Sequence, residues 1–381
     1  MKKMSWKFIG ILSVAVIALV ACSKKTDEVL NDEPAGISKN RQEMLTNLAD
    51  NIIIPSYARF KTRLDAMVTA SEGFAAAPSV SALQDFRSAW VTAYTEWQKV
   101  ELFDVGPGEK YTIRYFFNIY PASVDGINAN IQNPNANLEL PSNFPCQGFP
   151  ALDYLLNGLA STDAEILTYY TTDANAAKRL AYIKRINAHM TDLISKVSAE
   201  WNGSFKSSFT GRTGTDISSS TSIWVNALTL HYERYLRSAK FGIPSGAMLN
   251  GIVAANKVEA FYKKDISGIL AKTAHQAFID MFNGRHAVTG SEGPSISSYL
   301  DALDAKDPSS GVLLSDFINT QLSVCQTQIE SLDPNFYNLV QTNNQAMKNT
   351  YNELQKTVKY IKVDMTSAMS VTITYTDNDG D

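Results

Sequence analysis

The chain has 381 residues and is 45% hydrophobic, so it is long and apolar enough to bury one large or two ordinary cores. Its first 21 residues hold three lysines and no acidic residue, which leaves 31 basic and 38 acidic residues in the rest, a net charge of −7. This acidic body excludes nucleic acid as a partner, because no basic stripe is available to neutralise phosphates.

The first 21 residues have the layout of a secretory signal. Lys2, Lys3 and Lys7 precede an uncharged apolar run over 8–20, which is too short to span a membrane comfortably. The run ends in Leu-Val-Ala-Cys22, which resembles a bacterial lipobox. We therefore predict cleavage before Cys22, acylation of that cysteine and durable anchoring to a membrane through two or more acyl chains. The alternative is an ordinary signal peptide with a chance cysteine.

The protein is thus predicted to be an exported lipoprotein, placed in the outer membrane by the Ser23 that follows the anchor; its periplasmic or cell-surface face stays open. Residues 22–36 are mostly polar and predict a flexible tether. No later apolar stretch approaches the ~20 residues that a membrane helix needs.

Apolar spacings of three and four predict helices along the rest of the chain. The first, at 38–69, contains one slip in its apolar spacing, which predicts a kink at Pro55. Further helices are expected at 81–103, 122–131, 150–157 and 162–201. A Gly/Ser/Thr-rich loop over 203–222 is a candidate boundary, followed by helices at 222–241, 257–282, 309–332 and 336–366 and a short strand at 371–375.

The absence of strand–helix alternation predicts an all-α fold of two helical bundle-like domains, at 37–202 and 203–381. Lys99-Val100-Glu101 and Lys257-Val258-Glu259 are each followed by a phenylalanine two residues after the glutamate, a weak hint of duplicated halves. Cys146 and Cys325 remain after lipidation; they could pair as a disulfide or stay buried thiols.

Glu101 extends the apolar stripe of the 81–103 helix by one more step of four, so its carboxylate is predicted to face the core. A buried charge needs a partner, a metal or a proton. The alternative is a helix-end residue that reaches water. In 148–156, Gly148 and Pro150 start a helix, and Asp153 is expected in its first turn, where the helix dipole favours a carboxylate without any function.

His231 lies on the same face as Trp224, Leu228 and Tyr235, so it is predicted to point inward, more as a hydrogen-bonded core residue than as a ligand. Arg234, Arg237 and Lys240 are spaced by three and should cluster on the adjacent face. They could bind an anion, pair with Glu101 and Asp153, or simply be solvated. The other three histidines show no metal-site spacing, and no common protease or nucleotide motif is present.

These segments resemble the imelysin family over most of the mature chain. The resemblance lies in 47–60 with its Pro-Ser-Tyr, in Trp97 with Glu101-Leu-Phe-Asp-Val-Gly-Pro, in 236–244 and in the closing Thr-Tyr-Thr-Asp-Asn-Asp-Gly-Asp. It implies two all-helical domains with the family signature Gly-x-His-x-x-Glu near the cleft between them. That signature falls on 148–153, where Gly148 matches, but Pro150 replaces the histidine and Asp153 the glutamate.

The family includes proteins called metallopeptidases and others linked to iron uptake. Proline cannot ligate a metal, so the resemblance does not carry peptidase activity here, and no catalytic residue is assigned. We favour a binding or accessory lipoprotein with a small ligand or metal, iron or another divalent ion being the candidate, held by Glu101, Asp153, His231, Arg237 and Lys240 beside a membrane transporter. The alternatives are a metallopeptidase with another ligand set, such as His231 with Glu101, and a surface interaction protein without a small ligand.

Overall fold

The computed structural model describes residues 35–376. Within this range the regular structure is helical and no β-strand forms; two isolated bridges, Arg285 to Glu292 and Lys306 to Leu313, close short loops. The all-α prediction is therefore confirmed. The predicted signal, Cys22 and all but the end of the predicted tether lie outside the described residues. None of the described helices is long and apolar enough to cross a membrane.

The first long helical rod consists of three segments that run on without a break. They are α2 (Ala35–Asn47), the π-helical η1 (Leu48–Ile53) and α3 (Ile54–Ala76). The slip in the apolar spacing falls at η1, because a π-helix bonds each residue to the fifth and so holds extra residues in its turns. Pro55 lies at the start of α3, so the predicted proline kink is replaced by a π-helical segment next to the proline.

The helix α4 (Val80–Trp97) packs along α3 and is shorter than predicted. The Ser79 side chain caps its first turn by accepting a hydrogen bond from the Ala82 amide at 3.2 Å. After Trp97 the chain continues in tight turns, which bring Glu101 inward from a turn instead of from the helix. Rings from several elements fill the space behind: Phe60, Tyr94, Trp97, Phe117 and Phe149.

Short helices connect α4 to the next long one. They are α5 (Pro107–Lys110), α6 (Ile113–Phe117), α7 (Val124–Gln132), the 3₁₀ turn η2 (Pro141–Cys146), α8 (Gly148–Asn157) and α9 (Asp163–Thr171). The predicted helix over 162–201 is divided into α9 and α10 (Ala176–Trp201). The predicted loop over 203–222 contains a further helix, α11 (Ser204–Gly211).

The second half is built on one continuous rod of α12 (Ser220–Leu230), the π-helical η3 (His231–Gly242) and α13 (Ile243–Ser245). The predicted helix over 257–282 is wrong in its first part: only η4 (Ala255–Lys257) precedes α14 (Ser267–Phe282). The remaining elements are α15 (Ile296–Ala302), α16 (Leu314–Glu330), α17 (Phe336–Thr342), α18 (Asn344–Lys359), π-helical η5 (Tyr360–Met365) and α19 (Thr366–Ala368).

The predicted strand over 371–375 does not form. This segment lies beside α12, where the Asn226 side chain donates to the Thr372 carbonyl at 3.0 Å and accepts from the Thr374 amide at 2.8 Å. An asparagine side chain thus satisfies backbone groups that a neighbouring strand would otherwise bond.

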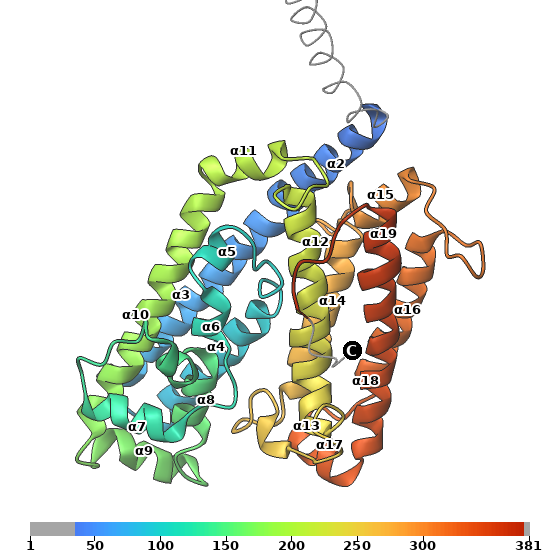
Figure 1. Cartoon of the computed structure of the whole chain (residues 1–381). Coiled ribbons are helices and arrows are strands. Elements are labelled where there is room, and N and C mark those ends of the chain that lie inside the picture. The colour runs from blue at the N-terminus through green and yellow to red at the C-terminus, as the bar shows by residue number, and fades with distance from the viewer. Residues whose placement is uncertain (1–34, 377–381) are drawn as a thin grey trace, which may run out of the picture. The chain divides into compact units, whose positions relative to one another are not determined.

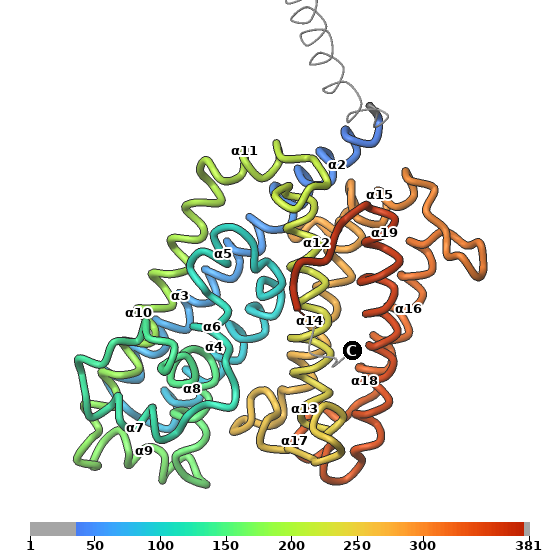
Figure 2. The backbone as a smooth tube through the Cα atoms, viewed as in Figure 1, coloured from blue at the N-terminus to red at the C-terminus, as the bar shows by residue number. Residues whose placement is uncertain are grey.

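The helices gather in two groups (Figure 1). In the first, α4 and α10 pack on α3; in the second, α18 packs on η3 and α16 contacts both α14 and α18. The tube view shows the same two groups (Figure 2). Contacts between α14 and α4 join the groups, and the chain from Asn40 onward forms one compact unit. The predicted domain division at residue 203 stays a prediction. Cys146 and Cys325 are both buried free thiols.

Candidate functional site

Glu101 lies in the turns that follow α4, and its side chain is 4% exposed. Its Oε1 accepts a hydrogen bond from the Asn118 Nδ2 at 3.0 Å, and its backbone carbonyl accepts one from the Arg114 guanidinium at 2.9 Å. Burial raises the pKa of Glu101, against the nearby charge of Lys240, which lowers it. The carboxyl lines a pocket of about 190 Å³ together with Tyr120, Tyr235 and Lys257.

Lys240 and Glu259 form a fully buried ion pair next to Glu101. The Lys240 ammonium also donates to the Gln98 Oε1 at 2.7 Å. The second Glu259 oxygen accepts from the Gln98 Nε2 at 2.9 Å and from the Asn118 Nδ2 at 2.8 Å. Because a buried ion pair is tolerated only when further hydrogen bonds compensate its desolvation, these two amides hold the pair in place. Lys240 is therefore bonded to Glu259, not to Glu101 or Asp153.

The two Lys-Val-Glu sequences meet at this network. Asn118 Nδ2 donates to Glu101 in the first copy and to Glu259 in the second, and the Tyr94 hydroxyl donates to the Asn118 Oδ1 at 2.6 Å. Sequence reasoning had singled out Glu101 but missed Gln98, Asn118 and Glu259. The repeated Lys-Val-Glu was the one signal that pointed to Glu259.

His231 begins the π-helical η3 and is fully buried, as its position on the apolar face predicted. Neither ring nitrogen has a hydrogen-bond partner among the described residues, so the expectation of a hydrogen-bonded core histidine is wrong. The ring stacks on Tyr235 with the centroids 6.2 Å apart. Burial, together with the positive charges of Arg114 and Lys240, holds the pKa of His231 well below its ordinary value, so the ring is neutral. No hydrogen bond joins it to Glu101.

Arg237 is buried on the side of η3 that faces α18. Its guanidinium donates to the Tyr351 hydroxyl at 3.1 Å and to the Gln355 side chain, and Glu233 lies one turn away on η3 at 3.9 Å. Arg234 bonds the Thr376 carbonyl at 2.7 Å. Arg234, Arg237 and Lys240 therefore do not form the predicted basic cluster, because each contacts a different part of the protein.

Asp153 is 1% exposed and lies in the middle of α8, since that helix begins at Gly148; the predicted first-turn position is wrong. Its carboxylate accepts hydrogen bonds from the backbone amides of Tyr262 and Lys263 at 2.8 and 2.9 Å and from Asn157 at 3.0 Å. Burial raises the pKa of Asp153 to about 7 in spite of these three bonds, each of which lowers it. The carboxylate ties α8 to the segment before α14.

Gly148 and Pro150, the other signature positions, are both buried. Gly148 has a φ of +70°, and a Cβ there would lie 2.3 Å from the Phe117 carbonyl oxygen. The glycine is therefore required by the backbone at the start of α8. Pro150 lines the Asp153 pocket, whose volume is about 220 Å³.

Glu101 and Asp153 line two pockets rather than one cleft. Both pockets have the cis-linked pair Tyr120 and Pro121 in their walls. Of the five predicted binding residues, the structure brings Glu101, Lys240 and His231 to one buried region, whereas Arg237 faces α18 and Asp153 faces the other pocket. Across residues 35–376, no group of three or more His, Cys, Asp or Glu side chains is arranged to hold a metal ion.

The fold and this site define an all-helical protein with two small pockets beside buried carboxyls. A family model described as Imelysin matches residues 53–363, and the chain therefore belongs to the imelysin family. Comparison with functionally curated proteins finds no match.

Two solved structures share the fold. One is a candidate iron-regulated protein A precursor from Parabacteroides distasonis, 17% identical, covering 86% of this chain and 95% of its own, with a TM-score of 0.67. The other is an imelysin-like protein from Psychrobacter arcticum, 16% identical, covering 89% of this chain and 98% of its own, with the same TM-score of 0.67. At these identities the likeness establishes the fold alone.

Proposed function

We propose that this imelysin-family chain is a membrane-anchored binding or accessory protein for metal uptake, with its ligand at the Glu101 pocket. The observation that supports this proposal is that the buried Glu101 carboxyl has few hydrogen-bond donors around it in the described part of the chain. The carboxyl is buried beside a pocket of about 190 Å³, and among the described residues Asn118 is the only hydrogen-bond donor to its oxygens. Asp153, in contrast, has both oxygens engaged by backbone amides. Of these two carboxyls, Glu101 is thus the one with acceptor capacity left for a ligand.

The pocket favours a metal that arrives with an anionic companion. A single carboxylate can supply one ligand to a hard or borderline divalent ion, and water or small-molecule atoms complete its coordination. Lys257 lines the same pocket and offers a positive charge to those companion atoms. Iron is the first candidate, because one protein of the same fold carries an iron-regulated name. In this proposal the lipid on Cys22 holds the protein beside a membrane transporter that receives the ligand.

The test is binding of Fe²⁺ and of Zn²⁺ by the full chain, measured by calorimetry and thermal unfolding. We expect saturating metal to raise the free energy of unfolding, by about 2.7 kcal/mol at a free concentration 100 times Kd. Glu101→Gln keeps the shape of the side chain and its contact with Asn118 but removes the charge. The metal-induced increase in the free energy of unfolding should therefore be lost in this variant. Because burial raises the pKa of Glu101, protons compete with the metal and affinity should increase with pH.

Glu72→Gln is the matched control, since Glu72 is an exposed glutamate on α3; it should bind like the wild type. The proposal fails if neither ion shifts unfolding, or if Glu101→Gln binds as well as Glu72→Gln. Metal-dependent cleavage of peptides that Glu101→Gln abolishes would replace the binding role with the peptidase alternative.

A further inference from the structure

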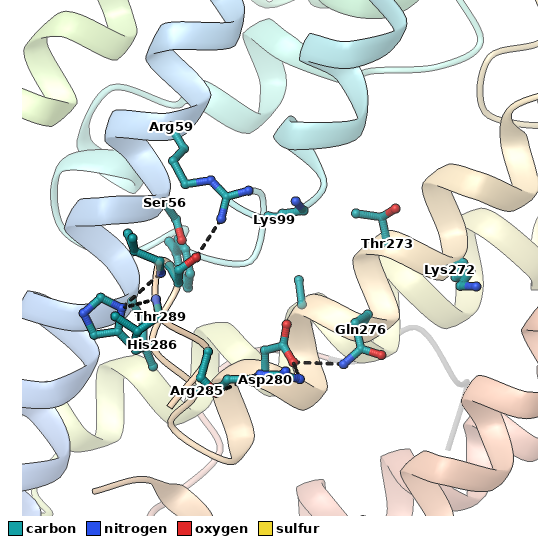
Figure 3. Close-up of a pocket in the computed structure, with 16 residues that line it drawn as sticks. Ser56, Arg59, Lys99, Lys272, Thr273, Gln276, Asp280, Arg285, His286 and Thr289 are labelled. Atoms are coloured by element: carbon teal, nitrogen blue, oxygen red, sulfur yellow. Dashed lines mark hydrogen bonds and ion pairs between the residues drawn. The ribbon is translucent and has the colours of Figure 1, made fainter. Parts of the chain in front are cut away.

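A further pocket lies away from Glu101 and has a volume of about 460 Å³. One wall comes from η1 and α3, the second from the turns after α4, the third from α14 and the fourth from the loop over 285–290. Figure 3 shows Arg59 and Lys99 on one side of this space and Lys272, Gln276 and Asp280 on the other. We call it the basic pocket.

The charge of the basic pocket is opposite to that of the chain. Four cationic side chains and one carboxylate line it, a net charge of +3 with His286 neutral, whereas the whole chain carries −4. The cations are Arg59, Lys99, Lys272 and Arg285, and the carboxylate is Asp280. A concave surface of one sign raises the local concentration of ions of the other sign.

Two of these cations are held in place from behind by one buried carboxylate. Glu96 is 7% exposed and lies 3.3 Å from the Arg59 guanidinium and 3.1 Å from the Lys99 ammonium. One negative charge therefore orients two positive charges, and this trio keeps a net positive charge at the pocket wall. Such orientation lowers the cost of ordering long side chains when a ligand binds.

The loop that closes the pocket is fixed through both backbone groups of Ala287. Its amide donates to the Asn51 carbonyl at 2.9 Å, and its carbonyl accepts from Arg59 at 2.7 Å. Within the loop, the His286 Nδ1 accepts from the amides of Val288 and Thr289 at 3.0 and 3.2 Å. These two bonds occupy Nδ1 and hold the ring against its own loop.

We propose that the basic pocket binds a small, multiply charged anion through carboxylate or phosphate oxygens. Guanidinium and ammonium groups form their strongest hydrogen bonds with such oxygens. The lining supplies cations from two opposite walls, Arg59 and Lys99 facing Lys272 across the space, so a ligand with charges at both ends engages both. This site is separate from the Glu101 pocket, so the proposal for the basic pocket does not depend on the proposed function.

The experiment is calorimetric titration of the full chain with citrate and, separately, with pyrophosphate. Binding of one probe and not the other assigns the carboxylate or the phosphate source. For Arg59→Gln we expect about tenfold weaker binding, since a charge-assisted hydrogen bond is lost. For Lys272→Gln we expect about threefold weaker binding, because this lysine is half exposed and pairs with the exposed Glu330. Added salt should weaken binding in every case.

Arg63→Gln is the matched control, because Arg63 is an exposed arginine one turn further along α3 and outside the pocket; it should bind as the wild type does. Arg59→Gln also removes the hydrogen bond from Arg59 to the Ala287 carbonyl and so could loosen the loop. Lys272→Gln tests the pocket without this side effect, because Lys272 pairs with the surface residue Glu330. The proposal is overturned if neither probe binds, or if both pocket variants bind like Arg63→Gln.

Discussion

At the scale of single residues, Asp153 shows how a signature position can serve the fold. Its carboxylate accepts the amides of Tyr262 and Lys263 and the side chain of Asn157. These bonds hold a segment in which Ala260 and Lys264 both have positive φ, a conformation that L-residues adopt at a cost. The aspartate therefore stabilises the wall of the pocket that it lines.

We expect Asp153→Asn to lower the free energy of unfolding by about 1–3 kcal/mol, because the new amide group faces a backbone N–H that then lacks an acceptor. The folded-state pKa of Asp153, about 7, is above its unfolded value, so the wild-type contribution is full below the unfolded pKa and declines as pH rises toward 7. The stability difference between wild type and variant should thus narrow from pH 4 to pH 7. Urea unfolding of both proteins over that range measures it; a constant or widening difference would contradict the assignment.

The inward position of Glu101 agrees with the prediction from the apolar stripe, although Glu101 reaches the core from a turn after α4 and not from the helix itself. Its partners could not be predicted. Asn118 is 17 positions away from Glu101 and 141 from Glu259, and contacts over such separations depend on how whole helices pack. That His231 has no hydrogen-bond partner within residues 35–376 could not be predicted either, because apolar spacing indicates burial but not which atoms surround the ring.

At the scale of elements, π-helical segments explain two of the differences from prediction: the kink expected at Pro55 and the expected basic cluster. In an α-helix, positions spaced by three share a face, which is why Arg234, Arg237 and Lys240 were expected to cluster. They lie in η3, where a turn holds more residues, so the same spacing turns each side chain to another direction. Periodicity detects the slip at η1 and cannot by itself distinguish a π-helical segment from a proline kink.

Gly148 gives the element-scale prediction. Gly148→Ala should destabilise the protein by at least about 1–2 kcal/mol, the cost of left-handed backbone for an L-residue, with the clash against the Phe117 carbonyl adding to it. Gly73→Ala is the paired control: it lies inside α3 with nothing within 4 Å of its Cβ position and should stabilise by about 0.5–1 kcal/mol. Thermal unfolding of both variants measures these effects. Equal changes of the same sign in the unfolding temperature would contradict the backbone argument.

At the scale of the whole molecule, the fold class followed from the sequence because many long amphipathic helices and no strand–helix alternation leave few other architectures. The division into domains is less accessible. Composition marked 203–222, but α11 occupies part of it, and the Lys240–Glu259 pair with Gln98 shows that side chains from both sides of residue 203 share one buried network. Such contacts leave no trace in local composition.

The lipid anchor is the whole-molecule prediction, and it concerns residues outside the described range. We expect the mature wild type to begin at Cys22 and to carry acyl chains, each buried CH₂ adding about 0.8 kcal/mol of membrane affinity. Cys22→Ala should carry no acyl chain and keep residues 1–21, because lipobox cleavage requires the acylated cysteine; Ser23→Ala should match the wild type. Intact mass spectrometry of protein extracted from membranes reports both features. An unacylated wild type cleaved at another bond would show an ordinary signal peptide, and the proposed function would then no longer include membrane anchoring. The proposals for the Glu101 pocket and the basic pocket would not be affected by this result.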